Sequence, residues 1–248
     1  PVAREEEGLD RPDAVVRGVL DDAPLAVHED GTTFFVRPLS GQKTGFYGDQ
    51  RDNRRVVAAS ARDRDVLDAF SYVGGFGLRA ARAGARSVHL VDNSEPAPES
   101  ARRGPEHSGV TNRVTFEKGN VLRVLEHMAR DDRRFDLVVI DPPKLVHRRK
   151  DLERGLRLYH EINVKAVRVT RPGGLLVSCS CSQHVTEPLF EEMLGAVAKE
   201  AGVRLQESYR GGQGADHPIL LPLEESRYLT CRMLRVLPGA SGSRAETS

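Results

Sequence analysis

Two of the three cysteines in this 248-residue chain lie one residue apart, in the stretch LLVSCSCSQ (175–183). Cys179 lies inside the apolar run, where a small buried residue is the ordinary interpretation, and Cys181 lies at its end. A disulfide between residues i and i+2 is strained, and zinc needs four ligands, of which only His184 is near. Because ligands bind at the carboxyl ends of parallel strands, Cys181 is a candidate nucleophile.

An Asp-Pro-Pro sequence at 141–143 directly follows the apolar run LVVI. Proline fixes its own φ and restricts the residue before it, so these residues form a stiff loop that can hold the Asp141 carboxylate against a planar base. A thiolate beside such a loop and a methyl donor suggests methylation of a pyrimidine at C5. That carbon is not nucleophilic until a group adds at C6, and covalent addition of Cys181 supplies the activation.

Three other strand ends carry residues suited to a nucleotide-like cofactor. The stretch DAFSYVGGFG (68–77) has glycines that permit a tight turn and a close approach of backbone to ligand. Asp92, 24 residues after Asp68, can accept hydrogen bonds from both ribose hydroxyls, and Asn120 can contact an adenine amino group. The dehydrogenase fingerprint G-x-G-x-x-G is not met by GGFGLR, so the pattern favours S-adenosylmethionine (SAM) over a nicotinamide cofactor.

The elements that position these residues alternate after Arg62. Strands are predicted at 65–70, 87–92, 113–120, 135–143 and 175–180, and helices at 74–84, 121–130, 151–170 and 187–202. Such alternation indicates a parallel, doubly wound sheet. The last two strands, 203–210 and 227–237, follow each other without a helix and predict an antiparallel edge pair. Three prolines within 94–109 predict a short or broken helix there.

The fold class is therefore α/β: a Rossmann-like class I methyltransferase sheet with an antiparallel edge pair, plus a small N-terminal β-rich domain. The β-rich part contains predicted strands at 14–20, 24–30 and 32–39. The expected organisation is a tail at 1–13, the β-rich domain at 14–60, the methyltransferase domain at 61–237 and a disordered tail at 238–248.

The composition indicates the cellular location of the protein more clearly than it indicates the substrate. Three cysteines, no signal-peptide pattern and no apolar run of about 20 residues predict a cytoplasmic protein without membrane contact. The formal net charge is only +1, which permits nucleic acid without demanding it. The stretch 144–157, however, is locally basic.

At this point the sequence resembles the bacterial large-subunit ribosomal RNA cytosine-5 methyltransferases, which join an RNA-binding PUA domain and a β-rich middle domain to a class I methyltransferase domain. The resemblance runs from about residue 14 to 237, and residues 1–13 are too few to form the PUA domain. Its most specific motifs are GQKTGFYGDQRDNR (41–54), FSYVGGFG (70–77), DPPKL (141–145), SCS (180–182) and ADHP (215–218).

The resemblance implies roles for individual residues. Cys181 matches the family's nucleophile, and Asp141 would hydrogen-bond the cytosine ring. Asp92 would hold the cofactor ribose, the 68–77 loop its methionine part, and residues 49–51 would cap it from the β-rich domain. The family usually carries an acidic residue where Asn120 stands. Members commonly pair as homodimers, although the sequence shows no interface.

The candidate site is thus a set of cofactor, substrate and catalytic residues. Cofactor-binding residues are expected to be Gln50, Arg51, Asp68, Phe70, Ser71, Gly74, Gly75, Asp92, Asn93, Asn120 and Asp141. Substrate-binding residues are expected to be Lys43, Pro142, Pro143 and Lys144, with Cys181 and Asp141 catalytic and no metal.

The leading hypothesis is methylation of ribosomal RNA. The first alternative is the same fold acting on a small molecule, with Cys181 a relic and the basic stretch a solvated helix face. The second is a catalytically silent RNA-binding or interaction protein.

Overall fold

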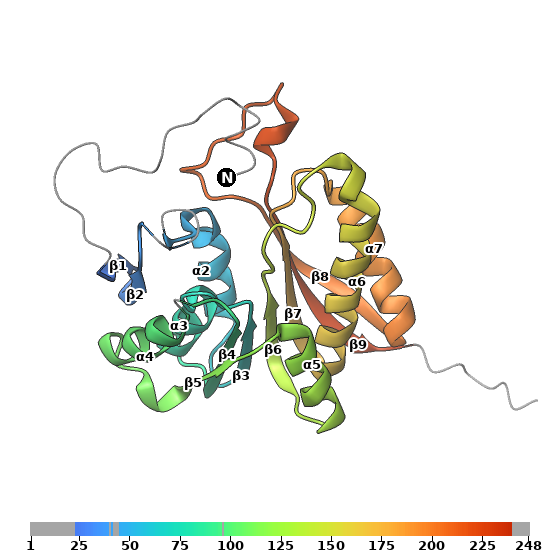
Figure 1. The fold of residues 1–248 in the computed structure, drawn as a ribbon. Helices are drawn as coiled ribbons and strands as arrows, with labels where there is room; N and C mark the ends of the chain where they lie inside the picture. Colours follow the sequence, from blue (N-terminus) through green and yellow to red (C-terminus); the bar gives the residue numbers. More distant parts are fainter. Residues whose placement is uncertain (1–22, 40, 42–44, 96, 240–248) are drawn as a thin grey trace, which may run out of the picture.

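The computed structural model describes residues 23–39, 41, 45–95 and 97–239, and its centre is a seven-stranded sheet with the order β5-β4-β3-β6-β7-β9-β8 (Figure 1). The strands are β3 (Asp65–Ala69), β4 (Ser87–Asp92), β5 (Val114–Lys118), β6 (Phe135–Ile140), β7 (Thr170–Ser180), β8 (Val203–Gly211) and β9 (Thr230–Pro238). Neighbours pair in parallel from β5 to β7, and β9 is antiparallel to both β7 and β8. The predicted sheet with an antiparallel edge is confirmed.

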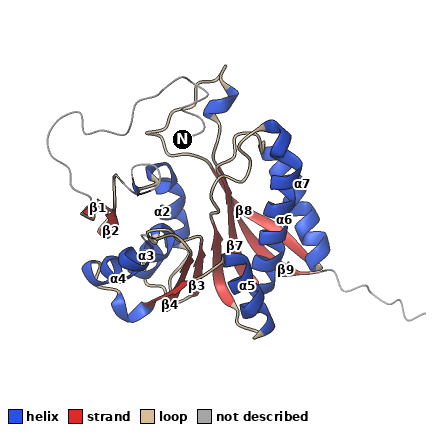
Figure 2. Cartoon of the chain, viewed as in Figure 1, coloured by secondary structure: helices blue, strands red, loops and turns tan. Residues whose placement is uncertain are grey.

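Helices cover both faces of this sheet (Figure 2). One face carries α5 (Val121–Arg130), α6 (Leu152–Val169) and α7 (Glu187–Ala201), and the other carries α2 (Arg51–Ala59), α3 (Gly75–Arg82) and α4 (Ala97–His107). Each face has its own apolar core. The central strands β3 and β6 are buried almost throughout, which explains why β6 is apolar except for Asp136 and why the residues of β3 between and after its two aspartates are apolar. None of the helices in the described ranges is long and apolar enough to cross a membrane.

A small antiparallel sheet of β1 (Leu25–Glu29) and β2 (Thr32–Val36) precedes the large one. Its second strand packs on α4: the Ser100 hydroxyl donates to the Phe35 carbonyl at 2.8 Å, and the Thr33 amide donates to the Ser108 hydroxyl at 3.0 Å. The predicted strand at 14–20 and most of the predicted tail at 238–248 lie outside the described residues.

The segment before the large sheet is less purely β-structured than the sequence suggested. Arg51–Ala59 forms a nine-residue helix, α2, where β-type patterning was expected. Its buried face includes Asn53 and Arg54 beside Val57 and Ala58. Because polar side chains fill half of that face, the apolar periodicity that normally marks a helix is missing.

The expectation of a short or broken helix around 94–109 is wrong. The structure has a continuous eleven-residue helix, α4, from Ala97 to His107. Pro98 lies in the first turn, where a missing N–H costs nothing, and only Pro105 lies in the interior. Pro96 is outside the described residues.

Candidate active site

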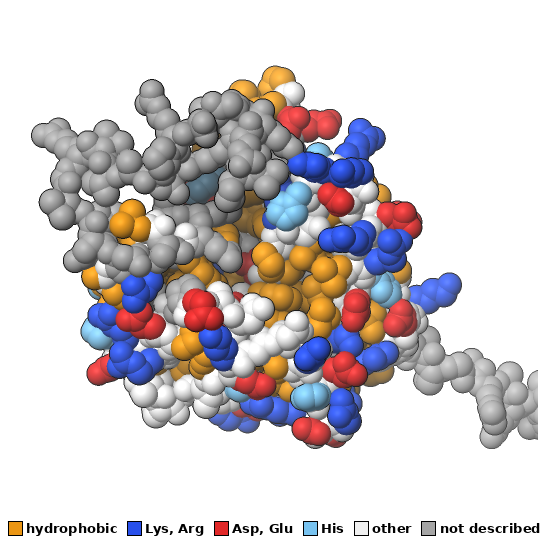
Figure 3. All heavy atoms as spheres, viewed as in Figure 1, with side chains coloured by type: hydrophobic (Ala, Val, Ile, Leu, Met, Phe, Trp, Pro, Cys, Tyr) orange, Lys and Arg blue, Asp and Glu red, His pale blue; other side chains and the backbone are white. Residues whose placement is uncertain are grey.

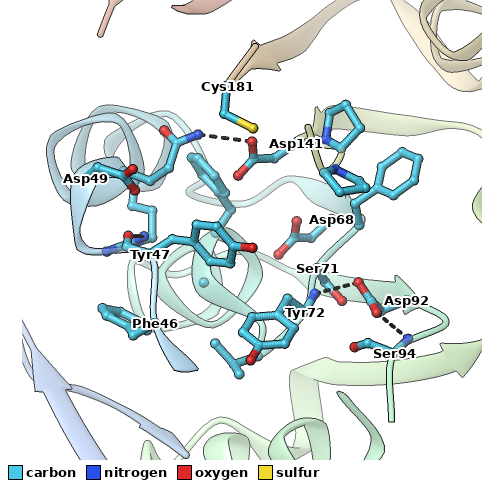
Figure 4. Close-up of a pocket in the computed structure, with 18 of the residues that line it drawn as sticks. Phe46, Tyr47, Asp49, Asp68, Ser71, Tyr72, Asp92, Ser94, Asp141 and Cys181 are labelled. Carbon is cyan, nitrogen blue, oxygen red and sulfur yellow. Dashed lines mark hydrogen bonds between the residues drawn. The ribbon is translucent and has the colours of Figure 1, made fainter. Parts of the chain in front are cut away.

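A cavity opens at the carboxyl ends of β3, β4, β6 and β7, the edge where the sequence placed the chemistry (Figure 4). Eleven of the predicted site residues line it: Gln50, Asp68, Phe70, Ser71, Gly75, Asp92, Asn93, Asp141, Pro142, Pro143 and Cys181. The remaining lining residues are Phe46, Tyr47, Asp49, Arg54, Tyr72, Val73, Phe76, Ser94 and Leu229.

The loop after β3 adopts an unusual backbone conformation. Phe70 (φ 65°) and Tyr72 (φ 48°) have positive φ although neither is glycine, and Gly74 (φ 82°) follows. Such conformations cost roughly 1–3 kcal/mol each for bulky residues and persist only where neighbours hold them. The amides of Phe70 and Ser71 both donate to the Val91 carbonyl, at 3.0 and 3.1 Å. This loop is therefore held against the end of β4, with its backbone turned toward the cavity.

Asp92 fixes the same loop from the end of β4. One of its carboxylate oxygens accepts from the Tyr72 amide at 2.8 Å and the other from the Ser94 amide at 2.7 Å (Figure 4). Each oxygen retains a second lone pair, so the carboxylate can still accept hydrogen bonds from ribose hydroxyls.

Asp68 is a buried carboxyl group in the cavity wall. Its Oδ2 accepts from the Gly77 amide at 2.7 Å, and its Oδ1 is buried without a hydrogen-bond partner. Burial, together with the nearby negative charges of Asp141 and Asp92, raises the pKa of Asp68 to about 7. The Ser71 hydroxyl is likewise buried without a partner. These acceptors suit a cationic ligand such as the ammonium group of the SAM methionine.

Gln50 connects the N-terminal part of the chain to the Asp-Pro-Pro loop. Its Nε2 donates to Asp141 Oδ1 at 3.0 Å, and its Oε1 accepts from Asn53 Nδ2 at 2.6 Å. Asn53 is held in turn by Tyr209, whose hydroxyl donates to Oδ1 at 2.9 Å. The side chain of Gln50 thus orients the Asp141 carboxylate.

The three cysteines differ in depth, as the sequence predicted for the first two. Cys179 and Cys231 are fully buried and lie opposite each other on β7 and β9, whereas Cys181 lies half-buried in the cavity wall. The hydrogen bond to Cys231, followed by burial, raises the pKa of the Cys179 thiol well above its ordinary value. Figure 4 shows the Cys181 sulfur and the Asp141 carboxylate directed into the same part of the cavity.

A hydrogen-bond network from α6 fixes the main chain on both sides of Cys181. The Tyr159 hydroxyl lies 3.0 Å from Ser180 Oγ and 3.1 Å from Ser182 Oγ, and all three side chains are buried. Ser182 Oγ also accepts from the Val146 amide at 3.2 Å. The end of β7 is therefore joined to the loop after β6 through Ser182 and to α6 through Tyr159.

Four predicted site residues do not line the cavity. Gly74 is the N-cap of α3, and Arg51 pairs with Asp216 of the ADHP motif at 3.1 Å. Asn120 is exposed, and its Oδ1 caps α5 by accepting from the Arg123 amide at 3.2 Å. Lys144 follows the lining prolines but is not itself part of the lining. Lys43 lies outside the described residues.

Most of the lining residues that the prediction omitted lie within quoted motifs, beside residues that it included. Tyr72, Val73 and Phe76 belong to FSYVGGFG, and Phe46 and Tyr47 to GQKTGFYGDQRDNR. Leu229 had no local signal, because it reaches the cavity only through the pairing of β9 with β7. In the described residues, no group of three or more His, Cys, Asp or Glu side chains could hold a metal ion.

Comparison with known proteins decides the family. Residues 10–208 match the family of S-adenosylmethionine-dependent methyltransferases. The chain belongs to this family. The methyltransferase is 37% identical over 227 residues to ribosomal RNA large subunit methyltransferase I of Pseudoalteromonas translucida, covering 91% of this chain and 57% of that protein. It is 36% identical over 235 residues to the protein of the same name from Klebsiella pneumoniae, covering 93% and 59%.

The relationship to bacterial large-subunit ribosomal RNA methyltransferases that the motifs indicated is confirmed, and the methyltransferase spans less than two thirds of these curated relatives. A solved structure of a protein assigned as a methyltransferase, in complex with S-adenosylhomocysteine, has the same fold. Its TM-score is 0.78 at 21% identity, covering 90% of this chain and 58% of that chain. The dependence on SAM, first expected from the strand ends, follows from the family.

Proposed function

We propose that this methyltransferase modifies C5 of a cytosine in large-subunit ribosomal RNA, with Cys181 as the nucleophile. The observation that carries the proposal is that Cys181 lies in one cavity with Asp141 and the loop after β3, while Cys179 and Cys231 are buried away from it. The ribosomal RNA substrate is carried over from the names of the relatives.

The residues present fit SAM. Asp68 and Ser71 offer buried acceptors without partners to its methionine end, and Asp92 offers carboxylate oxygens to its ribose. When bound, the cofactor supplies a methyl group as an electrophile. The raised pKa of Asp68 makes that carboxyl group responsive to a cation, because a nearby positive charge favours its ionised form.

The protein's own part in the reaction is to activate and hold the base. The Cys181 thiolate adds to C6 of cytosine, which makes C5 nucleophilic toward the methyl group. Asp141, oriented by Gln50, accepts a hydrogen bond from the exocyclic amino group of cytosine and holds the base in position for the addition. Removal of the C5 proton by a base then expels the thiolate and restores the aromatic ring with its new methyl group.

A tritium-release assay on ribosomal RNA carrying C5-tritiated cytosine tests this proposal. Wild-type protein with SAM is expected to release tritium, and Cys181→Ala is expected to release none because C6 addition is lost. Cys179→Ala is the matched control: it removes a buried thiol two residues away and is expected to cost about 1 kcal/mol of stability while retaining turnover.

Two results would contradict the proposal. Normal release by Cys181→Ala would remove the nucleophile assignment. Wild-type protein that binds SAM, measured by calorimetry, but releases no tritium would contradict C5 methylation of RNA and favour a small-molecule substrate.

A further inference from the structure

The loop that leaves the cavity wall at the Asp-Pro-Pro motif continues directly into the basic stretch at 144–157. This stretch contains six Lys and Arg against two Asp and Glu, a net charge of +4, while the whole chain carries only +1. The rest of the molecule therefore has a net charge of −3. The small net charge of the whole chain therefore hides an uneven distribution of charge. The positively charged stretch begins at the residue after Pro143, which lines the cavity.

Several of these charges are not compensated locally. In the described part of the chain, Lys144, Arg149, Lys150 and Arg154 form no ion pair, and the last three are exposed. Figure 3 shows Lys and Arg side chains gathered over the start of α6. Elsewhere arginine side chains are commonly neutralised, as in Arg171 with Asp136 at 2.7 Å and Arg232 with Glu187 at 2.6 Å.

We propose that Arg149, Lys150 and Arg154, called here the basic ridge, bind the phosphate backbone of RNA beside the nucleotide whose base enters the cavity. This inference rests on the proposed function and assigns to it a docking surface. A target base can reach Cys181 only if its flanking phosphates pass close to the cavity mouth, and the ridge begins at Arg149, six residues along the chain from Pro143 in the cavity wall. Exposed cations without an ion-pair partner suit the phosphates of a nucleic acid. When such side chains neutralise phosphates, the counterions condensed on the nucleic acid are released, and this release favours binding.

The ridge also explains how a nearly neutral protein can bind a polyanion. Long-range attraction depends on where charge lies and not only on its sum, since charges more than about 8–10 Å apart are screened at physiological salt. The negative remainder of the surface would then disfavour other orientations of the RNA.

The test is the salt dependence of RNA binding, measured by fluorescence anisotropy with a fluorescein-labelled single-stranded RNA. The variant Arg149→Gln/Lys150→Gln/Arg154→Gln is expected to bind about tenfold more weakly, and its plot of log K against log [KCl] is expected to be shallower by about 2. Loss of positive charge at the first turn of a helix does not destabilise that helix, and thermal unfolding checks that the fold is retained.

Two matched variants test whether RNA binding depends on the position of the removed charges and on the charge itself. Arg130→Gln/Arg168→Gln/Lys199→Gln removes three exposed cations near the C-terminal ends of α5, α6 and α7, at the opposite edge of the sheet, and is expected to bind RNA like wild type. Arg149→Lys/Lys150→Arg/Arg154→Lys keeps every charge and is expected to retain the wild-type salt slope.

Equal affinity and slope in wild type and the ridge variant would overturn the proposal, as would an equal loss in the opposite-edge control. Tighter binding to phosphatidylserine vesicles than to RNA, abolished in the ridge variant, would overturn RNA as the partner. Tritium release is scored separately: ridge-dependent RNA binding without release would remove the proposed C5 chemistry and leave the ridge in place.

Discussion

The burial of Asp68 in the cavity wall changes the pH at which its carboxyl group ionises. Because its folded-state pKa is raised from 3.8 to about 7, the cofactor-free protein holds a proton there, between these two pH values, that the unfolded chain has lost. A cationic ligand favours the ionised carboxylate, so SAM binding is expected to release this proton. Affinity should therefore rise from about pH 5 to about pH 7 and then level off.

Asp68→Asn tests this linkage. The variant is expected to bind SAM more weakly at pH 8 and with little dependence on pH. Isothermal titration calorimetry in two buffers of different ionisation enthalpy measures the released proton directly. A wild-type affinity that stays constant across this range would contradict the proposed contact.

The raised pKa of Asp68 also determines whether the stability of the folded protein rises or falls with pH. Because the folded-state pKa lies above the unfolded value of 3.8, the contribution of Asp68 to stability is greatest at low pH and falls as pH rises toward 7. Asp68→Asn should therefore stabilise the cofactor-free protein more at pH 8 than at pH 5. Thermal unfolding at the two pH values distinguishes the two signs, with Asp136→Asn as the control: the hydrogen bond from the Asp65 amide, followed by the charges of Arg171 and Arg86, lowers the pKa of Asp136 against the effect of burial.

At the scale of elements, α6 positions the end of β7 through the hydroxyl of Tyr159. Burial raises the pKa of this phenol to about 12, so it stays protonated and can donate to or accept from Ser180 and Ser182. Tyr159→Phe leaves two buried serine hydroxyls short of a partner and should cost about 1–3 kcal/mol of stability. Turnover is expected to fall while SAM affinity, set by other loops, is retained.

Ile162→Val is the matched control on the same helix, because it removes buried volume without a hydrogen bond and costs about 1 kcal/mol. Steady-state tritium release and calorimetric SAM binding compare the two variants. If Ile162→Val slows turnover as much as Tyr159→Phe, the effect of the tyrosine is one of general stability and not of positioning.

The elements that the sequence predicted well are those whose burial is uniform. Strands β3, β4 and β6 read as short apolar runs between turn signals because both faces of a central parallel strand are covered. Helix α2 was missed because Asn53 and Arg54 occupy its buried face, and their hydrogen bonds depend on partners that are distant in sequence.

The candidate site also contains residues that the sequence predicted correctly and residues that it did not. Asp68, Asp92, Asp141 and Cys181 were found because each lies at or just after the carboxyl end of a strand, and the topology brings those strand ends to one edge. Asn120 also follows a strand, but its side chain is used to cap the helix that begins there. Capping and ligand binding require the same residue type, so the sequence could not separate them.

At the scale of the whole molecule, the N-terminal hairpin is tied to the cavity wall by buried charge. Glu29 on β1 accepts two hydrogen bonds from Arg54 and lies 3.8 Å from Arg79 Nε; all three side chains are less than 10% exposed. Arg54 also donates to the Tyr47 carbonyl at 2.8 Å, and both residues line the cavity. Any displacement of the hairpin is thus transmitted to the proposed substrate site.

Glu29→Ala is expected to lower the free energy of unfolding by about 3–5 kcal/mol, because it leaves the buried Arg54 guanidinium without its carboxylate partner, whereas Arg79 keeps its ion pair with Asp30. Glu99→Ala breaks the half-exposed pair with Arg37 and should cost about 1 kcal/mol or less. Urea unfolding of both variants measures the difference. A similar small loss in both would show that the hairpin is not held by this cluster.

The position of β9 between β7 and β8 has a consequence for how the chain is made. Strand β8 is synthesised before β9 but is joined to the sheet only through it. While the nascent chain is shorter than residue 230, the edge of β7 that ends beside Cys181 therefore exposes unpaired backbone groups, and β8 has no neighbour. Folding during translation therefore cannot complete this sheet until residues 230–238 have left the ribosome exit tunnel, although β8 has left it earlier.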